Sequence, residues 1–324
     1  EKCKIGQIYD AALTNQNEGN PASQTDIIYR NNLIYNSEWS YEYWNRDSLS
    51  ETKNVYFINN TCINAGKSWG HLQRPIKRGR HIYISQNEAA TNNFYILNNI
   101  FYKATSSCLF VLRASDLDSF NIDYNCWYQS GNDTLINISW GSAVVDYYTM
   151  SGFSDYQTDY QQDSNSIATY PIFVDTLNND FDFSALSPCI DAGTPDTTNF
   201  NTGLEDFDGN NRILDGDNIP PAVIDIGCYE YDYTSGISTN SFNGNSFKVY
   251  PNPASSYITI EFENNQNAVW DVSLINIKGQ EILQKDNITE PKFIIKTKGI
   301  SKGVYLLQLT NEEGQMFSRK IIVK

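Results

Sequence analysis

The sequence predicts an all-β protein: a right-handed parallel β-helix, which is a solenoid of stacked coils, followed by a small Ig-like β-sandwich. Three observations predict this fold class. The 324 residues include 22 Tyr and 16 Phe beside many paired asparagines, and aromatic residues favour strands while asparagine favours turns. A ten-residue pattern recurs four times in the first half of the chain. No long stretch shows the apolar period of an α-helix.

Each of the four blocks has an asparagine at its sixth position, after a short β-prone run and before further apolar residues. These asparagines are 28, 39 and 26 residues apart, which suits a solenoid repeat. One coil cannot bury its inner face alone, so coils stack with equivalent positions above one another. Asparagine tolerates the left-handed backbone of a corner, and stacked amides bond to each other, which predicts a structural ladder. Hairpin turns in an antiparallel sandwich are the alternative. The blocks are Ile27–Asn36, Val55–Asn64, Phe94–Lys103 and Phe120–Gln129, and the ladder residues are Asn32, Asn60, Asn99 and Asn125.

The formal net charge of −15 argues against nucleic-acid binding, because a duplex binder needs a basic surface to displace phosphate counterions. Residues 245–324 hold ten Lys/Arg and eight Asp/Glu, about +2, so residues 1–244 carry 13 minus 30, or −17. Against that acidic background, residues 67–81, here called the basic segment, hold five Lys/Arg, both histidines and no carboxylate. The basic segment falls in the longest interval between asparagines, so we expect it to leave the coil as a loop. No apolar run is long enough to span a membrane.

Several runs resemble right-handed parallel β-helix proteins of the pectate-lyase-like superfamily. They are residues 69–81 with the asparagine coils, Tyr124–Tyr128, Asp163–Ile167, Pro171–Asp175, and the closing runs Ser187–Gly193 and Asp225–Tyr231. The resemblance covers roughly residues 25–232 and implies the fold. It leaves the activity open, because the superfamily holds polysaccharide lyases, glycoside hydrolases, isomerases and adhesins. Few coils are visible, so we expect residues 1–232 to be the C-terminal coils and closing segment of a longer β-helix.

An uncharged stretch rich in Ser, Gly and Asn at 233–246 predicts a linker. Short alternating strands separated by Gly-containing turns then predict a β-sandwich over 247–324. This module closely resembles the type A C-terminal sorting domain of the bacterial type IX secretion system. The resemblance implies a protein of a Bacteroidota-type bacterium that the type IX machinery exports, and that is secreted or held at the outer cell surface. The matching runs are Tyr250–Pro253, Ile277–Gln280, Gly299–Tyr305 and Lys320–Lys324.

The basic segment offers the groups that an acidic polysaccharide requires. Arginine binds carboxylates and sulfates bidentately, and β-elimination needs a base and a group that neutralises the developing charge. The alternative is that the loop merely packs on the acidic coils and balances their charge. We expect His71 or His81 as the base and Arg74, Arg78 and Arg80 as its charge partners. We expect substrate-binding roles for Lys67, Trp69, Lys77, Trp127 and Tyr128.

Other residues leave further chemistry open. A glycoside hydrolase needs two carboxylates, and no spacing selects a pair among Glu88, Asp116, Asp118 and Asp123. The run Trp39–Trp44 contains four aromatic residues, which suit either a sugar platform or a half-buried strand. Six cysteines without metal spacing form three disulfides or remain buried thiols.

Calcium is the one cofactor that the sequence suggests. Oxygen-bearing side chains alternate around glycine turns near residue 210, which suits Ca²⁺, although no bidentate Glu follows at the EF-hand spacing. The predicted ligands are Asp206, Asp208, Asn210, Asp215 and Asp217.

Taken together, the residues predict a secreted or cell-surface protein that acts on a polysaccharide, as a lyase or a glycoside hydrolase. A non-catalytic adhesin or glycan-binding protein is the alternative, because a solenoid needs no active site to be stable. The expected partners are a polysaccharide, acidic if the basic segment binds it, and the type IX secretion machinery.

Overall fold

The computed structural model describes residues 1–17, 21–68, 78–86, 90–131, 133–139, 145–176, 178–216, 221–232, 247–262, 269–311 and 316–324. The chain forms two compact units, one of Glu1–Pro171 with Ser187–Tyr233 and the other of Ile172–Leu186 with Thr234–Lys324. Each unit has its own hydrophobic core. The predicted linker at 233–246 lies outside the described residues.

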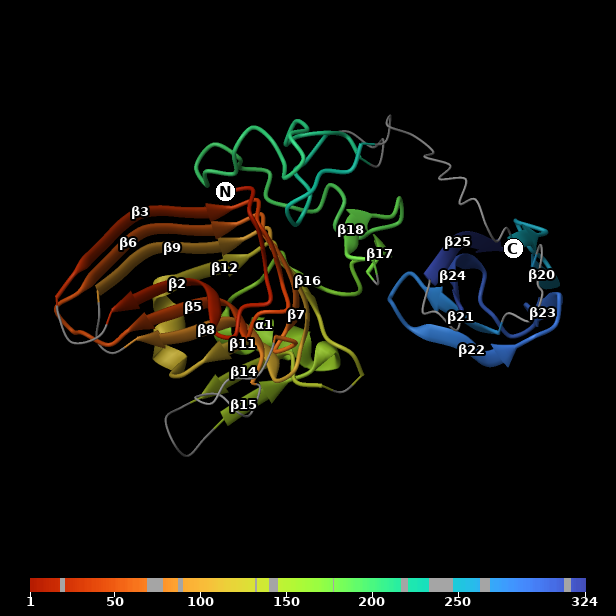
Figure 1. The fold of residues 1–324 in the computed structure, drawn as a ribbon, viewed down its shortest axis with the longest axis horizontal. Coiled ribbons are helices and arrows are strands. Elements are labelled where there is room, and N and C mark those ends of the chain that lie inside the picture. Colours follow the sequence, from red (N-terminus) through yellow and green to blue (C-terminus); the bar gives the residue numbers. More distant parts are fainter. Residues whose placement is uncertain are drawn as a thin grey trace. The chain divides into compact units, whose positions relative to one another are not determined.

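The first unit is a solenoid of three sheets, to which each complete coil contributes one strand apiece (Figure 1). Neighbouring strands are parallel, except that β15 runs antiparallel to β14. One sheet holds β1 (Lys4–Gly6), β4 (Leu33–Tyr35), β7 (Thr61–Ala65), β10 (Ile100–Ala104), β13 (Cys126–Tyr128) and β16 (Ile167–Ala168). The second holds β2 (Ala11–Asn17), β5 (Trp39–Asn45), β8 (Arg80–Gln86), β11 (Ser107–Val111), β14 (Ile136–Ser139) and β15 (Val145–Tyr148). The third holds β3 (Ser23–Arg30), β6 (Glu51–Ile58), β9 (Ala90–Leu97) and β12 (Phe120–Asp123).

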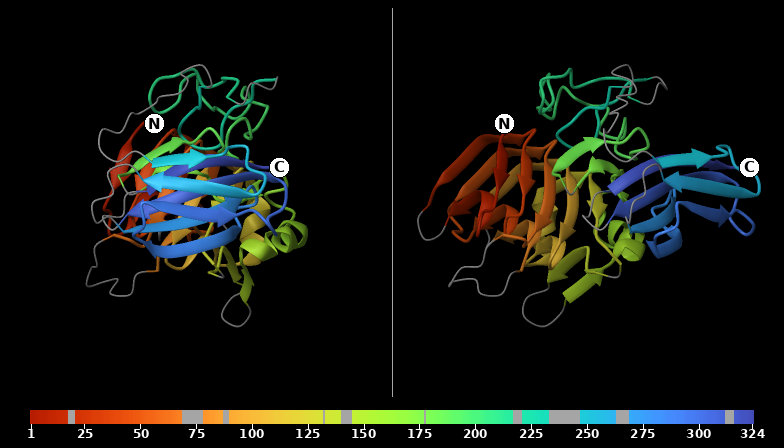
Figure 2. Two further views of the ribbon diagram at one scale, coloured as in Figure 1. Left: turned by 90° about the vertical axis from the view of Figure 1, so that its right-hand side faces the viewer. Right: turned by 45° about the vertical axis from the view of Figure 1, so that its right-hand side comes forward.

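The register of these sheets follows the sequence repeat. Ile27, Val55, Phe94 and Phe120, the first residues of the four blocks, pair in that order across β3, β6, β9 and β12. The strands lie as parallel rungs in the right-hand view of Figure 2. Parallel pairing excludes the alternative of hairpin turns for these blocks and confirms the predicted fold class.

Alternate side chains of each strand point into the solenoid and fill it with aromatic and aliphatic groups. Tyr41 and Tyr43 of β5 are fully buried, and the centroids of their rings lie 6.1 and 5.2 Å from that of Phe94. The phenol of Tyr41 donates to Asn15 Oδ1 at 2.6 Å, so its polar tip is satisfied inside the core. For these two tyrosines the half-buried strand describes the 39–44 run better than a sugar platform.

The four predicted ladder residues form one continuous chain of hydrogen bonds. The side-chain amide of Asn32 donates to Asn60 Oδ1 at 2.9 Å, Asn60 donates to Asn99 Oδ1 at 3.0 Å, and Asn99 donates to Asn125 Oδ1 at 3.1 Å. The same oxygens accept the main-chain N–H groups of Asn32, Asn60 and Asn99 at 2.9–3.0 Å. At the end of the ladder, Asn125 donates its main-chain N–H to Ser166 Oγ at 2.7 Å. The ladder therefore satisfies buried polar groups in every rung that it crosses.

The left-handed corner conformation belongs to the residue before each ladder asparagine, which corrects the sequence-based assignment. The φ angles are 54° at Asn31, 52° at Asn59, 56° at Asn98 and 54° at Tyr124. The ladder residues themselves are free of this strain, because their role is to present the amide.

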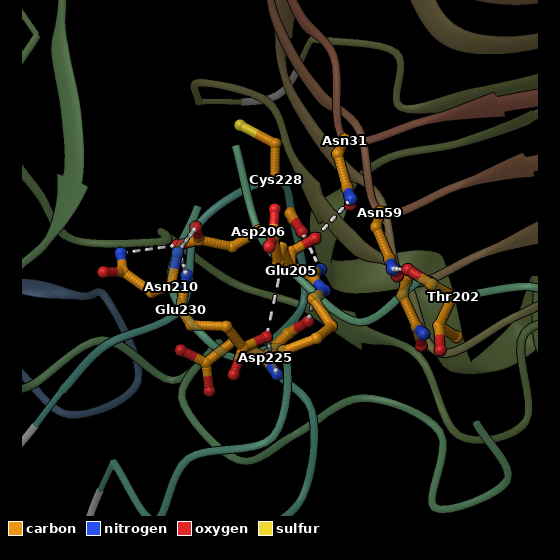
Figure 3. Close-up of polar contacts among 12 residues, drawn as sticks. Asn31, Asn59, Thr202, Glu205, Asp206, Asn210, Asp225, Cys228 and Glu230 are labelled. Carbon is orange, nitrogen blue, oxygen red and sulfur yellow. Dashed lines mark hydrogen bonds and ion pairs between the residues drawn. The ribbon is translucent and has the colours of Figure 1, made fainter. Parts of the chain in front are cut away.

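The closing segment, residues 187–232, binds these corner side chains. Asn31 Nδ2 donates to the main-chain oxygen of Glu205 at 2.7 Å, and Asn59 Nδ2 donates to that of Thr202 at 3.0 Å (Figure 3). Asn98 Oδ1 accepts the N–H of Thr194 at 2.9 Å. One asparagine of each pair thus holds the coils together, and the other anchors the closing segment.

The helices are short and were not predicted. They are η1 (Ala114–Ser119), η2 (Met150–Gly152) and α1 (Phe153–Tyr160). In α1 only Phe153 and Tyr156 are buried, which is too few apolar positions for a periodic signal. No described helix has the length and apolar character that a membrane crossing requires.

The second unit contains two antiparallel sheets around one core, as the predicted sandwich requires. One sheet holds β19 (Phe247–Tyr250), β20 (Tyr257–Phe262) and β23 (Lys292–Lys296). The other holds β22 (Glu281–Ile288), β21 (Trp270–Asn276), β24 (Gly303–Asn311) and β25 (Met316–Val323). A hairpin of β17 (Phe173–Asp175) and β18 (Asp180–Phe183) also belongs to this unit.

Replacing Asn60 by alanine should lower the free energy of unfolding of the solenoid by about 3 kcal/mol, because it leaves the main-chain N–H and the side-chain amide of Asn32 without their buried acceptor. Urea unfolding of the intact chain measures this change. Asn92→Ala, at an exposed position of β9, is the control and should change the unfolding free energy little. Equal effects of the two substitutions would contradict the role of the ladder.

Candidate functional site

The predicted loop residues are only partly covered by the structure. Trp69, His71, Arg74 and Lys77 lie outside the described residues, as do Glu88 and Asp217. Lys67 is exposed in the turn after β7. Arg78 is exposed; its N–H donates to Glu38 Oε1 at 2.6 Å, and its carbonyl accepts the indole N–H of Trp39 at 3.3 Å. The end of the basic segment is therefore held against the start of β5.

His81 is buried inside the solenoid. Its Nε2 lies 3.0 Å from the carbonyl oxygen of Lys103, and its Nδ1 lies 2.9 Å from Ser40 Oγ. Because a carbonyl only accepts, Nε2 of the neutral ring carries the proton and Nδ1 accepts the proton of Ser40. Burial lowers the pKa of His81 to about 4, so the ring is neutral at pH 7. A side chain with 0% exposure cannot contact a polysaccharide, so His81 takes no part in the candidate site.

Arg80, one residue earlier, contacts the rings of Tyr83 and Phe110 on the outer face of the second sheet, although it lies two residues before the inward-facing Ile82. Tyr41, Ile82, Leu109 and Ile136 point inward there and are fully buried, so the residues that follow them point outward. These outward residues form one row across five neighbouring strands, about 4.8 Å per rung. In order from β2 to β14, the row is Thr14, Glu42, Tyr83, Phe110 and Asn137.

Five side chains on this face form an aromatic–arginine cluster: Trp39, Trp44, Arg80, Tyr83 and Phe110. The ring of Tyr83 is central and lies nearly parallel to its neighbours, with centroid distances of 4.7 Å to Trp39, 5.9 Å to Trp44 and 5.2 Å to Phe110. The guanidinium carbon of Arg80 lies 3.6 Å from the ring centroid of Phe110 and 5.3 Å from that of Tyr83. Such stacking fixes the planar cation on an aromatic surface.

Glu42 is the carboxylate of the row. Thr14 Oγ1 donates to its Oε2 at 3.3 Å, and the side chain is 6% exposed. Tyr83, its neighbour in register, is 7% exposed. Burial raises the pKa of Tyr83, with Glu42 adding to this effect and Arg80 opposing it. The phenol is therefore protonated at neutral pH and can donate a hydrogen bond or a proton.

The aromatic–arginine cluster and Glu42 together offer apolar ring faces, a fixed cation, a carboxylate and a phenol on one face. Sequence reasoning identified Arg80 and considered Trp39 and Trp44, but it missed Glu42, Tyr83 and Phe110. Aligning the outward positions of successive coils is the signal that would have found them.

Trp127 and Tyr128 lie on another sheet, in β13, and do not join this cluster. Trp127 is fully buried, and its indole N–H donates to Asp163 Oδ1 at 2.9 Å. Tyr128 is partly buried and stacks on Tyr102, with ring centroids 5.3 Å apart. The structure thus places Trp127 in the core and not on a sugar-binding surface.

Asp206, the first of the predicted calcium ligands, accepts hydrogen bonds from its own closing segment. Asp206 Oδ1 accepts the N–H groups of Asp208 at 3.0 Å and Asn210 at 2.8 Å. Its Oδ2 accepts the N–H of Glu230 and the amide of Asn210, both at 3.0 Å (Figure 3). These donors occupy lone pairs of the Asp206 carboxylate, and calcium binding by the five predicted ligands stays a prediction. Within the described ranges, no group of three or more His, Cys, Asp or Glu is arranged to hold a metal ion.

The closing segment also contains a buried ion pair between Arg212 and Glu230. Arg212 is 1% exposed, its Nη1 lies 3.3 Å from Glu230 Oε1, and its Nη2 donates to the carbonyl of Gly227. Burial raises the pKa of Asp225 to about 7 and that of Glu230 well above its ordinary value, with Arg212 opposing both shifts. Since all these groups bind within the segment, we assign them to its folding.

All six cysteines are free thiols, and five of them are buried. Cys62 pairs in register with Phe101 and points into the core. Cys126 pairs with Ile100, one position earlier, and therefore faces the other side of the sheet. The prediction of buried thiols agrees with this state, but the two cysteines are not equivalent in the repeat.

The comparisons with known proteins identify the C-terminal module. Residues 248–324 match the family described as a secretion system C-terminal sorting domain, of the type IX system. The protein is therefore addressed to the cell surface or to the exterior.

The chain is also similar to an endo-acting ulvan lyase from Formosa agariphila. The two are 32% identical over 89 residues, which is 27% of this chain. The chain spans 17% of the length of that curated relative.

The burial of His81 predicts a specific loss of stability in acid. The unfolded imidazole binds a proton near pH 6.5 and the folded one near pH 4, so the unfolded state gains protons first as the pH falls. The stability of the protein relative to a His81→Asn variant should fall by about 3 kcal/mol between these pH values. Urea unfolding across the pH range measures this difference, since the carboxyl groups are common to both proteins. A difference independent of pH, or an imidazole NMR signal of His81 that titrates above pH 6, would contradict the burial.

Proposed function

We propose that this exported protein binds an acidic polysaccharide on the outer face of the β5–β8–β11 sheet and cleaves it by β-elimination. The observation that carries the proposal is the position of Arg80, which lies against the rings of Tyr83 and Phe110 in the aromatic–arginine cluster, with Glu42 in the adjacent rung. A fixed guanidinium beside ring faces suits a sugar that bears a carboxylate or a sulfate.

The same groups can be assigned to the steps of an elimination. Arg80 would bind the carboxylate of a uronate and stabilise the negative charge that grows on it. A base would remove the proton from the carbon next to that carboxylate; Glu42 is one candidate and His71 of the basic segment is the other. The neutral phenol of Tyr83 would give its proton to the departing glycosidic oxygen as the C–O bond breaks and the C=C bond forms.

Elimination is favoured over glycoside hydrolysis because Glu42 is the one carboxylate of the five-residue row. Hydrolysis needs a second carboxylate across the scissile bond. The similarity to an endo-acting ulvan lyase also supports the lyase class, although it extends over only 89 residues.

A second candidate is a surface protein that binds the polysaccharide without cleaving it. The exposed fractions of 6% for Glu42 and 7% for Tyr83 favour this function, because little of either group is open to a substrate. Trp44, Arg80 and Phe110 are more exposed and would suffice for binding.

Arg80→Ala should weaken binding of oligogalacturonate, an acidic test saccharide, by roughly tenfold or more, because one hydrogen bond to a charged group is worth at least that factor. Calorimetry on the intact chain measures the affinity. Lys53→Ala removes an exposed cation from β6, on another sheet, and should leave binding unchanged. Equal losses in both variants would indicate general charge attraction and would refute the assigned site.

Tyr83→Phe should reduce the rate of polysaccharide cleavage by roughly a hundredfold or more while leaving binding nearly intact, since it removes a proton donor but keeps the ring. The measurement is the ultraviolet absorbance of the unsaturated sugar that elimination creates. Glu42→Gln, which keeps the shape of the side chain, tests the base in the same assay. Binding without any increase in absorbance by the unaltered protein, on uronate and sulfated polymers alike, would favour the non-catalytic candidate.

A further inference from the structure

The second unit contains a groove of about 420 Å³ between β19 and β25, the edge strands of its two sheets. The groove is lined by Phe247, Lys248, Val249, Tyr250, Asn252, Arg319, Lys320 and Ile321. Phe247, Val249 and Ile321 provide apolar surface that belongs to or packs on the core. Three of the eight lining residues are cationic, and none is acidic.

Side-chain and main-chain hydrogen bonds join the two sheets at one end of this groove. Asn252 Nδ2 donates to the carbonyl of Lys320 at 2.7 Å, and Asn252 Oδ1 accepts the N–H of Ile322 at 2.9 Å. The N–H of Ala254 donates to the carbonyl of Ile322 at 2.7 Å, and the N–H of Lys324 donates to the carbonyl of Ala254 at 2.8 Å. The groove lies where the two strands leave this junction, so its walls are fixed at one end.

Arg319 occupies a position where a core side chain would be expected. It pairs in register with the fully buried Leu307, and Ile321, two residues along the same face, is also fully buried. The Arg319 side chain is nevertheless exposed, and its guanidinium carbon lies 5.5 Å from the ring centroid of Phe247. Among the residues that the structure describes, neither Arg319 nor Lys320 has an ion-pair partner. A charged group at an inward-facing position without a carboxylate beside it leaves the groove complementary to an anion.

We propose that this groove binds an extended acidic segment of a protein of the export machinery. Carboxylates of the segment would pair with Arg319 and Lys320, and its small apolar side chains would lie on Phe247, Val249 and Ile321. A sugar fits less well. The ring of Phe247 is 9% exposed with Arg319 over it, and the hydroxyl of Tyr250 already donates to Glu261 at 2.6 Å. The groove therefore lacks an open ring face for a pyranose.

The proposal extends the sorting assignment and does not depend on polysaccharide activity, so the two can fail separately. The first test is the binding of a fluorescent peptide of alternating glutamate and valine to the full chain, measured by anisotropy. The double variant R319E/K320E should bind it at least tenfold more weakly, and R319Q/K320Q should also lose affinity. The control K278E/K285E reverses two exposed charges of the same unit, Lys278 before β22 and Lys285 on β22, the opposite edge strand, and should bind like the unaltered chain. A melting measurement shows that each variant is folded.

The second test is secretion of the full-length protein in a host with the type IX machinery. The secreted fraction should fall about tenfold or more for R319E/K320E and remain unchanged for K278E/K285E. Normal secretion of R319E/K320E would overturn the proposal. Equal loss of peptide binding in both reversals, or binding of oligogalacturonate in preference to the peptide, would also overturn it.

Discussion

The solenoid depends on the asparagine ladder, because a coil corner buries main-chain N–H groups that no strand of the same coil can satisfy. Each ladder amide accepts the N–H of the rung beside it and donates its own side-chain hydrogen onward, so the rungs must stay in one register. That constraint decides where extra residues can go. The interval between Asn60 and Asn99 is the longest, and its additional residues fall in the sequence between the end of β7 and the start of β8. The rest of each coil keeps its place in the stack.

One short segment supplies both the core and the surface. His81 and Arg80 are neighbours in β8, yet the histidine is enclosed by Ser40, Phe101 and Lys103 while the arginine lies on an outer aromatic face. Regular alternation would place Arg80 on the side of Ile82 and His81 on the side of Tyr83, so the first two residues of β8 depart from it. The consequence is electrostatic: burial removes the charge of the imidazole, whereas stacking on Phe110 leaves the guanidinium charged and oriented. The candidate site is thus assembled from successive rungs and not from a single loop.

The two units use cations in different ways. In the closing segment, Arg212 is buried beside Glu230 and donates to the carbonyl oxygen of Gly227, so its charge is paired within the fold. In the sorting module, Arg319 stands at an inward-facing position and stays exposed over Phe247. The first arrangement stabilises a segment whose hydrogen bonds to Asn31, Asn59 and Asn98 attach it to the coils. The arrangement of Arg319 leaves an exposed cation in the sorting module that is available to an anionic partner.

The sequence by itself determined the coil repeat, the identity of the ladder asparagines and the sorting module, because each depends on short patterns of neighbouring residues. The sequence did not determine which face of the strand each basic residue would occupy. It therefore assigned Arg80 and His81 to one site, whereas His81 lies inside the solenoid and Arg80 lies on its outer face. It also could not bring Glu42, Tyr83 and Phe110 into one row. These residues follow their ladder asparagines by 10, 23 and 11 positions, since the insertion precedes β8, and no constant offset relates them. Only the hydrogen-bonded stacking of the rungs makes these three residues neighbours, because the pairing of strands does not depend on the number of residues between them.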